Sequence, residues 1–238
     1  MVSQLQPSAQ SEVIYPDSDG QPMADNTEQF RWIVVIQQNL EWLFADNPAV
    51  FVAGDLLWYP VEGSNTICMA PDVLVVFGRS KGYRGSYKQW VEDGIAPQVV
   101  FEILSPSNRL TEMNKKQVFY NRHGVEEYYL YDPKHRDLSG WLRGSEGLDV
   151  IDPIDQWVSP RLQIRFDLTG SELQLYRPDG KRFLSYVEIA QQAEQERQRA
   201  EQEHQRAEQA EQQLEQERQR SQALANKLRD MGVDPEQL

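Results

Sequence analysis

Two acidic residues stand in segments that otherwise have the composition of buried β-strands. Asp72 comes directly before the apolar run 73–77, and Glu102 interrupts the apolar run 99–104. Burying an ionised carboxylate is strongly unfavourable unless a cation or hydrogen bonds replace its lost hydration. Carboxylate oxygens are ligands that hard divalent metal ions prefer. The two acids therefore predict a metal site, provided that the fold brings them together.

Two lysines in the helical stretch after Glu102 could add an amine to this site. Lys116 and Tyr120 are four residues apart and share one helix face, whereas Lys115 points about 100° away. We therefore expect Lys116, with Tyr120 beside it, to face the acids. Two carboxylates and an amine form a constellation that suits a metal ion and a phosphate group.

A polar turn, residues 105–108, follows the strand that holds Glu102. Its hydroxyl groups, from Ser105 and Ser107, would lie at the carboxyl end of that strand, where α/β sheets commonly place ligands. Structural alternatives remain open for both acids. Asp72 could cap a turn and contact water, and Glu102 could form a structural salt bridge with an arginine.

The charge of the chain is unevenly distributed. The whole chain carries a net charge of −13, yet residues 79–122 hold eight basic and four acidic residues. Such a local excess could steer an anionic substrate to one place, or it could be a chance fluctuation among solvated side chains. The segment 81–90 alternates basic and aromatic residues, which is typical of a nucleic-acid-stacking loop but also of an ordinary packed loop. The basic candidates for nucleic-acid binding are Lys81, Arg84, Lys88, Arg109 and Lys115.

The elements that must position these residues alternate between helix and strand. An arm, residues 1–26, precedes a helix-period apolar face at 30–44. Strand-like runs follow at 50–53, 56–59, 73–77, 99–104, 128–131, 139–142, 157–159, 162–166 and 173–176, and a helix is expected at 111–123. A strand, a helix and a strand at this spacing predict a crossover, and hence an α/β fold with a mixed sheet.

Composition places limits on the class of protein. The chain of 238 residues is 39% hydrophobic, which suits one globular domain, residues 27–185, with an extension. Cys68 is the single cysteine, so no intrachain disulfide is possible and a reducing compartment is favoured. No stretch has the length and apolarity of a membrane span or a secretory leader. We therefore expect a cytoplasmic protein without a membrane partner.

The tail, residues 186–238, changes abruptly to Gln, Glu, Arg and Ala. No glycine or proline interrupts it before Gly232, which predicts a helix of about 45 residues. A seven-residue spacing relates Ala193, Ala200, Ala207, Leu214, Ser221 and Leu228, which is a weak heptad pattern. A solvated helix and a coiled-coil homodimer are both consistent with this pattern.

The same residues carry a resemblance. Pro71-Asp72, the run Glu102 to Ser107, Lys116 with Tyr120, and the run Gly124 to Pro133 together resemble the Uma-type restriction endonuclease family, a bacterial branch of the PD-(D/E)XK nuclease superfamily. The resemblance covers roughly residues 15–185. It implies a restriction-endonuclease-like fold, with a mixed central sheet flanked by helices and a site at a strand fork.

The resemblance also implies roles for individual residues. Asp72 and Glu102, with the backbone carbonyl of Ile103, would hold Mg²⁺ or Mn²⁺, and Lys116 would orient or deprotonate the attacking water. One position departs from the superfamily pattern, because Leu104 stands where a lysine is usual. In the resembling family the amine comes from the following helix, where Lys116 falls. Whether an acid of the N-terminal arm, such as Asp17 or Asp19, joins the site stays open.

The predicted function is Mg²⁺-dependent endonucleolytic hydrolysis of DNA. A catalytically degenerate nuclease fold that dimerises or recruits a partner through its C-terminal helix is the main alternative. A metal hydrolase acting on a small phosphorylated compound is a third possibility, since fold analogy excludes neither.

Overall fold

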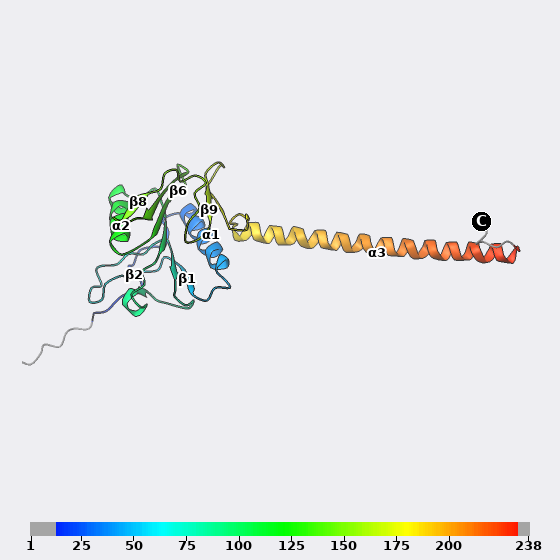
Figure 1. Ribbon diagram of the computed structural model, residues 1–238, viewed down its shortest axis with the longest axis horizontal. Coiled ribbons are helices and arrows are strands. Elements are labelled where there is room, and N and C mark those ends of the chain that lie inside the picture. Colours follow the sequence, from blue (N-terminus) through cyan, green and yellow to red (C-terminus); the bar gives the residue numbers. More distant parts are fainter. Residues whose placement is uncertain (1–12, 233–238) are drawn as a thin grey trace, which may run out of the picture. The chain divides into compact units, whose positions relative to one another are not determined.

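A computed structural model describes residues 13–232 of the chain, in two compact units that divide after Ser185. The first unit holds the sheet and two helices, and the second holds the long helix α3 (Figure 1). Within the described residues, no helix combines the length and the apolarity needed to cross a membrane.

A mixed six-stranded sheet forms the centre of the first unit. Its strands lie in the order β1-β3-β5-β6-β7-β8; β5 and β6 are parallel, and all other neighbours are antiparallel. This arrangement confirms the predicted α/β fold with a mixed sheet. The strands are β1 (Val50–Gly54), β3 (Val73–Phe77), β5 (Val99–Ile103), β6 (Glu127–Asp132), β7 (Asp137–Arg143) and β8 (Leu148–Val150).

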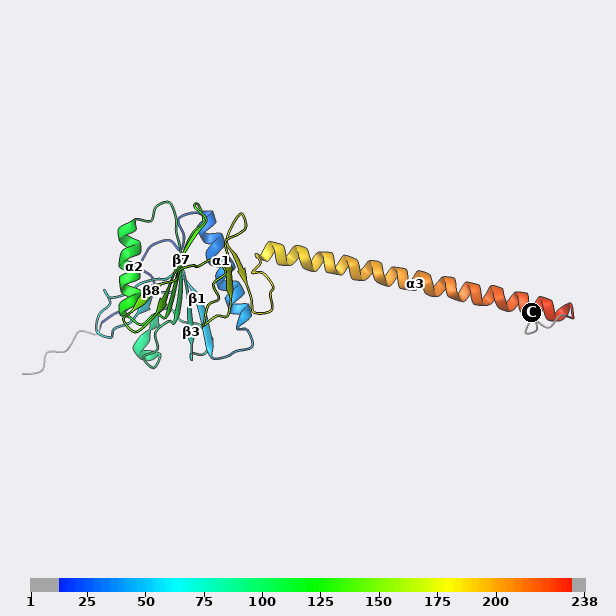
Figure 2. The ribbon, with the colours of Figure 1, turned by 45° about the horizontal axis from the view of Figure 1, so that its top comes forward.

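Two helices cover opposite faces of this sheet (Figure 2). Helix α1 (Thr27–Leu43) begins where the Asn26 side chain accepts hydrogen bonds from two backbone N–H groups, and its apolar face packs on Val73 and Val75. Helix α2 (Leu110–Arg122) is the crossover between the parallel strands β5 and β6, and it packs on the other face. Alternate residues of each central strand therefore point to different helices.

Smaller elements complete the unit. They are β2 (Trp58–Tyr59), β4 (Tyr87–Lys88), the 3₁₀-helix η1 (Gln89–Val91), β9 (Arg165–Asp167) and β10 (Gln174–Tyr176). The strand predicted at 157–159 is wrong, because Val158 makes only an isolated bridge to Arg165. The run 162–166 forms a strand only from Arg165 onward, since Gln163 adopts a left-handed backbone with φ of 58° inside a turn.

Helix α3 (Tyr186–Asp230) forms the second unit and confirms the predicted long helix. It is amphipathic only weakly, and side chains such as Leu214 and Leu224 are more than half exposed. The coiled coil stays a prediction. Residues 1–12 of the predicted arm, residues 233–238 of the tail and the side chain of Leu228 lie outside what the structure describes.

Candidate active site

Strand register brings the two acids together. β3 and β5 are antiparallel, with Val73 opposite Phe101, and one further step of this register places Asp72 opposite Glu102. Opposite residues of an antiparallel pair point to the same face, here the face that α2 covers. Both side chains are buried, with 7% of Asp72 and 2% of Glu102 exposed.

Asp72 is held by the neighbouring strand. Its Oδ2 accepts a hydrogen bond of 2.6 Å from the backbone N–H of Ile103. Burial, and secondly the Glu102 carboxylate, raises the pKa of Asp72 to about 8, although Lys116 and the Ile103 N–H oppose this change. The free protein at neutral pH therefore holds Asp72 largely in its protonated form.

Glu102 has two side-chain partners, and both come from α2. Lys116 Nζ lies 2.6 Å from Oε2, and the Tyr120 hydroxyl donates to Oε1. Burial acts to lower the pKa of Lys116, but Glu102 and Asp72 outweigh it and the net change is upward. Burial, together with Glu102, raises the pKa of Tyr120 well above its usual value. Lys116 is therefore a charged ammonium group and Tyr120 a neutral donor.

The two alternatives considered for these acids are resolved differently. Glu102 does form a buried salt bridge, but its partner is Lys116 rather than an arginine. Asp72 binds the backbone of the neighbouring strand, so it is not a turn cap at the surface. The structure thus brings together Asp72, Glu102, Lys116 and Tyr120, whose roles in catalysis stay predictions.

The backbone carbonyl of Ile103 is also within this group of residues. It accepts a hydrogen bond of 3.0 Å from Nε2 of the buried Gln29 on α1. A carbonyl oxygen has two lone pairs, so this bond leaves it able to bind a second group. Gln29 thus positions one of the predicted metal ligands, although no sequence pattern singles it out.

A cleft of about 420 Å³ lies beside this group of residues, and Gln29 is part of its lining. Asp72 and Lys116 line it, and so does Asp55, which follows β1 directly. Burial first, and then Asp19, raises the pKa of Asp55. Asp55 was missed as a candidate because its place in the site depends on β1 pairing with β3. The cleft is lined by Asp19, Gln21, Pro22, Met23, Ala24, Asp25, Gln29, Asp55, Met69, Ala70, Asp72, Ser107, Asn108, Glu112 and Lys116.

Acids from the N-terminal arm do reach the cleft. Asp19 lines it, and Asp25 accepts hydrogen bonds from the hydroxyls of Ser105, at 2.6 Å, and Ser107. These two hydrogen bonds, first that from Ser105 and then that from Ser107, lower the pKa of Asp25. Ser105 and Ser107 therefore tie the arm to the end of β5. The other arm acid, Asp17, instead accepts a hydrogen bond from Ser86.

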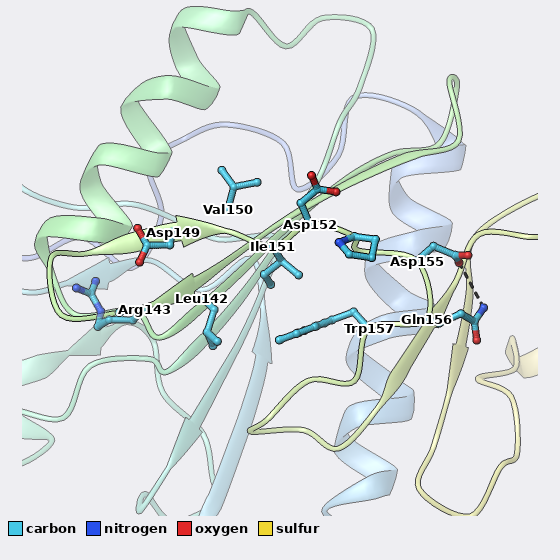
Figure 3. Close-up of a pocket in the computed structure, with 11 residues that line it drawn as sticks. Leu142, Arg143, Asp149, Val150, Ile151, Asp152, Asp155, Gln156 and Trp157 are labelled. Carbon is cyan, nitrogen blue, oxygen red and sulfur yellow. Dashed lines mark hydrogen bonds between the residues drawn. The ribbon is translucent and has the colours of Figure 1, made fainter.

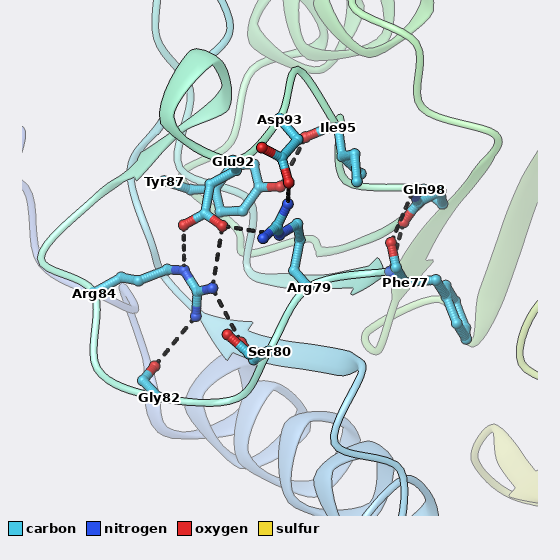
Figure 4. A network of polar contacts seen from close by, with 10 residues as sticks. All are labelled: Phe77, Arg79, Ser80, Gly82, Arg84, Tyr87, Glu92, Asp93, Ile95 and Gln98. Atoms are coloured by element: carbon cyan, nitrogen blue, oxygen red, sulfur yellow. Dashed lines mark hydrogen bonds and ion pairs between the residues drawn. The ribbon is translucent and has the colours of Figure 1, made fainter.

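Arg84, a candidate for nucleic-acid binding, belongs to an ion-pair network (Figure 4). Its Nε lies 2.6 Å from Glu92, its Nη2 donates to the carbonyl of Ser80, and its guanidinium stacks 4.0 Å above the ring of Phe51. Arg79 joins the same network through Glu92 and Asp93. This network fixes the loop after β3.

The other four basic candidates differ in their surroundings. Lys81 forms an ion pair of 2.8 Å with Glu41, and Lys88 lies 5.5 Å above the ring of Tyr15. Arg109 and Lys115 are exposed, and among the residues that the structure describes neither has an ion-pair partner. Nucleic-acid binding by these residues stays a prediction.

A second cavity lies along the edge strand β8 (Figure 3). Ile151 and Trp157 contribute its apolar surface, and Asp149, Asp152 and Asp155 are placed around it. It shares no lining residue with the cleft at Asp72. We therefore locate the candidate site in the cleft, where buried ionisable groups converge.

The oxygen donors grouped around Asp72 fit a hard divalent cation, and of these donors Asp72 itself lines the cleft. Mg²⁺ is usually held by one or two carboxylates with water completing its octahedral shell, and Asp72, Glu102 and the Ile103 carbonyl are oxygen donors of this kind. In the described part of the chain, no three or more His, Cys, Asp or Glu side chains are arranged as a metal-binding group.

Comparisons with known proteins give a family match and one similar solved structure. The model of the Uma2 family, described as "Putative restriction endonuclease", matches residues 10–169. A crystal structure described as a "putative nuclease belonging to DUF820", from Anabaena variabilis ATCC 29413, has a TM-score of 0.43 and 17% identity to this chain; the match covers 57% of this chain and 72% of that chain. Among curated proteins, none matches the chain significantly.

Proposed function

We propose that this chain, which belongs to the Uma2 family of "Putative restriction endonuclease" proteins, is a Mg²⁺-dependent endonuclease that hydrolyses phosphodiester bonds of DNA. Family membership supports a nuclease and a restriction-endonuclease-like fold. The observation that carries the finer proposal is the contact between Lys116 and Glu102. Through this contact, α2 supplies the amine that the superfamily usually takes from a lysine at position 104, where this chain has leucine.

In this proposal the metal would be held by Asp72, Glu102 and the carbonyl of Ile103. When bound, a divalent ion would activate a water molecule and stabilise negative charge on the phosphate. Because Asp72 has a pKa of about 8, it must lose its proton before it can act as a ligand at neutral pH. Metal affinity should therefore increase as the pH rises towards 8.

The raised pKa of Lys116 favours one of its two predicted roles. An ammonium group can donate hydrogen bonds to water or to a phosphate oxygen, but it cannot accept a proton. We therefore assign Lys116 to orienting the attacking water and offsetting charge on the scissile phosphate. Tyr120 is a positioning residue, because its hydroxyl holds the Glu102 carboxylate from the opposite oxygen.

The direct test is cleavage of supercoiled plasmid DNA by the full chain with Mg²⁺ or Mn²⁺. The variants Asp72→Asn, Glu102→Gln and Lys116→Met keep side-chain size and remove a carboxyl group or the ammonium group, so each should abolish nicking. Glu127→Gln is a matched control, because Glu127 is also a fully buried strand carboxylate but its partners are Tyr129, Ser159 and the N–H of Arg161.

The control should cleave at the rate of the unmodified chain. Equal cleavage by all variants would assign the activity to a contaminant. Absence of cleavage by a folded wild-type chain, with both metals and with linear, supercoiled and single-stranded DNA, would favour the degenerate binding module instead. Circular dichroism of each variant would show that the comparison is made between folded proteins.

We further propose that α3 dimerises the chain. Its seven-residue pattern of alanine and leucine supports this idea, although alanine at such positions buries little apolar area. A dimer would carry two copies of the proposed cleavage site.

A further inference from the structure

A groove lies beside the cleft at Asp72, on the outward face of α2. Its volume is about 690 Å³, and Met69 lines both the groove and the cleft. Its apolar surface includes Val61, Ile67 and Val118, whose side chains are 39%, 39% and 57% exposed. The groove is lined by Val61, Ile67, Met69, Thr111, Asn114, Lys115, Val118, Phe119, Arg122 and His123.

The groove differs from the cleft in the charge of the side chains that line it. Five acidic side chains line the cleft, whereas the described residues that line the groove include no acid and two bases. Within the part of the chain that the structure describes, neither Lys115 nor Arg122 has an ion-pair partner. In a chain of net charge −13, such a pair of available cations is complementary to a polyanion.

Two of the residues that line the groove carry aromatic rings. The imidazole of His123 packs against the ring of Phe119 with a centroid distance of 4.5 Å, and both residues line the groove. Burial, and secondly the neighbouring Arg122, lowers the pKa of His123, so the imidazole is neutral at pH 7. The groove thus combines apolar and aromatic side chains with two exposed basic residues, Lys115 and Arg122, which we call its rim.

We propose that this groove binds unpaired nucleotides of the DNA strand next to the scissile phosphate. The proposal rests on the nuclease function and deepens it by naming the form of the substrate. Basic rims that follow the phosphates, with apolar and aromatic surfaces that receive the bases, are the general means of binding single strands. A duplex would instead present sugar and phosphate to the groove, because its bases are stacked inside. The enzyme would therefore prefer single-stranded segments, flaps or junctions over blunt duplexes.

Fluorescence anisotropy of the full chain in EDTA would measure binding without cleavage. The probes are a labelled single-stranded oligonucleotide and a blunt duplex of the same sequence. The rim variant combines Lys115→Glu with Arg122→Glu and so reverses the charge of both basic residues of the groove. Arg136→Glu combined with Lys181→Glu is the matched control, because both residues are exposed, neither lines the groove, and the change in net charge is identical.

The rim variant should weaken single-strand binding at least tenfold, and the control less than twofold. If both rim residues contact phosphates, the slope of log affinity against log salt should fall by about 1.4 in magnitude. Val118→Ser, at a site that is more than half exposed, should weaken single-strand binding severalfold without changing that slope.

Equal losses in the rim and control variants, tighter wild-type binding to the duplex, or no binding of either probe would overturn the proposal. Unchanged DNA affinity with a changed sedimentation mass in the rim variant would reassign the groove to contact with a second copy of the chain. The nuclease proposal is judged separately: wild type that binds the single strand but never cleaves would reject the nuclease and keep the groove.

Discussion

The stability of the metal-free protein should fall as the pH rises, and Asp72 should be the cause. Its pKa is about 8 in the folded protein and 3.8 in the absence of the fold. Between these values the folded chain binds one proton more than the unfolded chain, so the free energy of unfolding decreases with pH. The slope is at most about 1.4 kcal/mol per pH unit, and the total over the window is on the order of 5 kcal/mol.

The variant Asp72→Asn isolates this contribution. Asparagine does not titrate, and its carbonyl oxygen can still accept the hydrogen bond from the Ile103 N–H. Urea denaturation of both proteins in EDTA, followed by circular dichroism at pH 5, 6, 7 and 8, gives the difference in unfolding free energy. That difference should shift in favour of the variant by roughly 1 kcal/mol for each pH unit.

Adding Mg²⁺ supplies the complementary measurement. A bound cation favours the carboxylate form, so at pH 8 it should stabilise the wild-type chain but not Asp72→Asn. Parallel pH profiles of the two proteins in EDTA would refute the reasoning, because they would mean that Asp72 is already ionised in the folded state at pH 5.

Three further changes test other parts of the structure. Tyr120→Phe removes a donor from the buried Glu102, and urea denaturation should show a loss of roughly 1–3 kcal/mol, together with slower plasmid cleavage; unchanged values for both would contradict the role of the hydroxyl. Asp55→Asn removes a carboxylate from the cleft, and the Mg²⁺ concentration for half-maximal cleavage should rise about tenfold; an unaltered Mg²⁺ requirement would exclude Asp55 from the site. A chain that ends at Ser185 should sediment as a monomer while the full chain sediments as a dimer, and identical behaviour of the two would reject dimerisation through α3.

The positions of the central elements could be predicted because local patterns determine them. The predicted runs at 73–77 and 99–104 contain β3 and β5, the helical stretch after Ser107 is α2, and the tail from Tyr186 to Asp230 is one long helix. Lys116 and Tyr120 could be placed on one helix face because their spacing matches the helical period. That α2 directs this face towards Glu102 follows from its role as the crossover between parallel strands.

The parts of the site that could not be predicted depend on contacts between distant segments. Asp55 enters the cleft only because β1 pairs with β3, and Asp25 only because the arm reaches the turn after β5. Gln29 is one polar residue on a helix, and its bond to the Ile103 carbonyl spans 74 residues of sequence. No local sequence pattern predicts such contacts, because each depends on strand register and on packing across the whole sheet.

The structure explains how Lys116 on α2 can take the place of a lysine at position 104. Side chains two residues apart on a strand point to the same face, so a lysine at position 104 would approach Glu102 along the strand. Lys116 approaches the same carboxylate from the helix that covers this face, with Nζ 2.6 Å from Oε2. The amine then depends on the packing of α2 rather than on the strand itself. Catalysis should consequently be sensitive to substitutions that loosen α2 from the sheet, even where Asp72 and Glu102 keep their places.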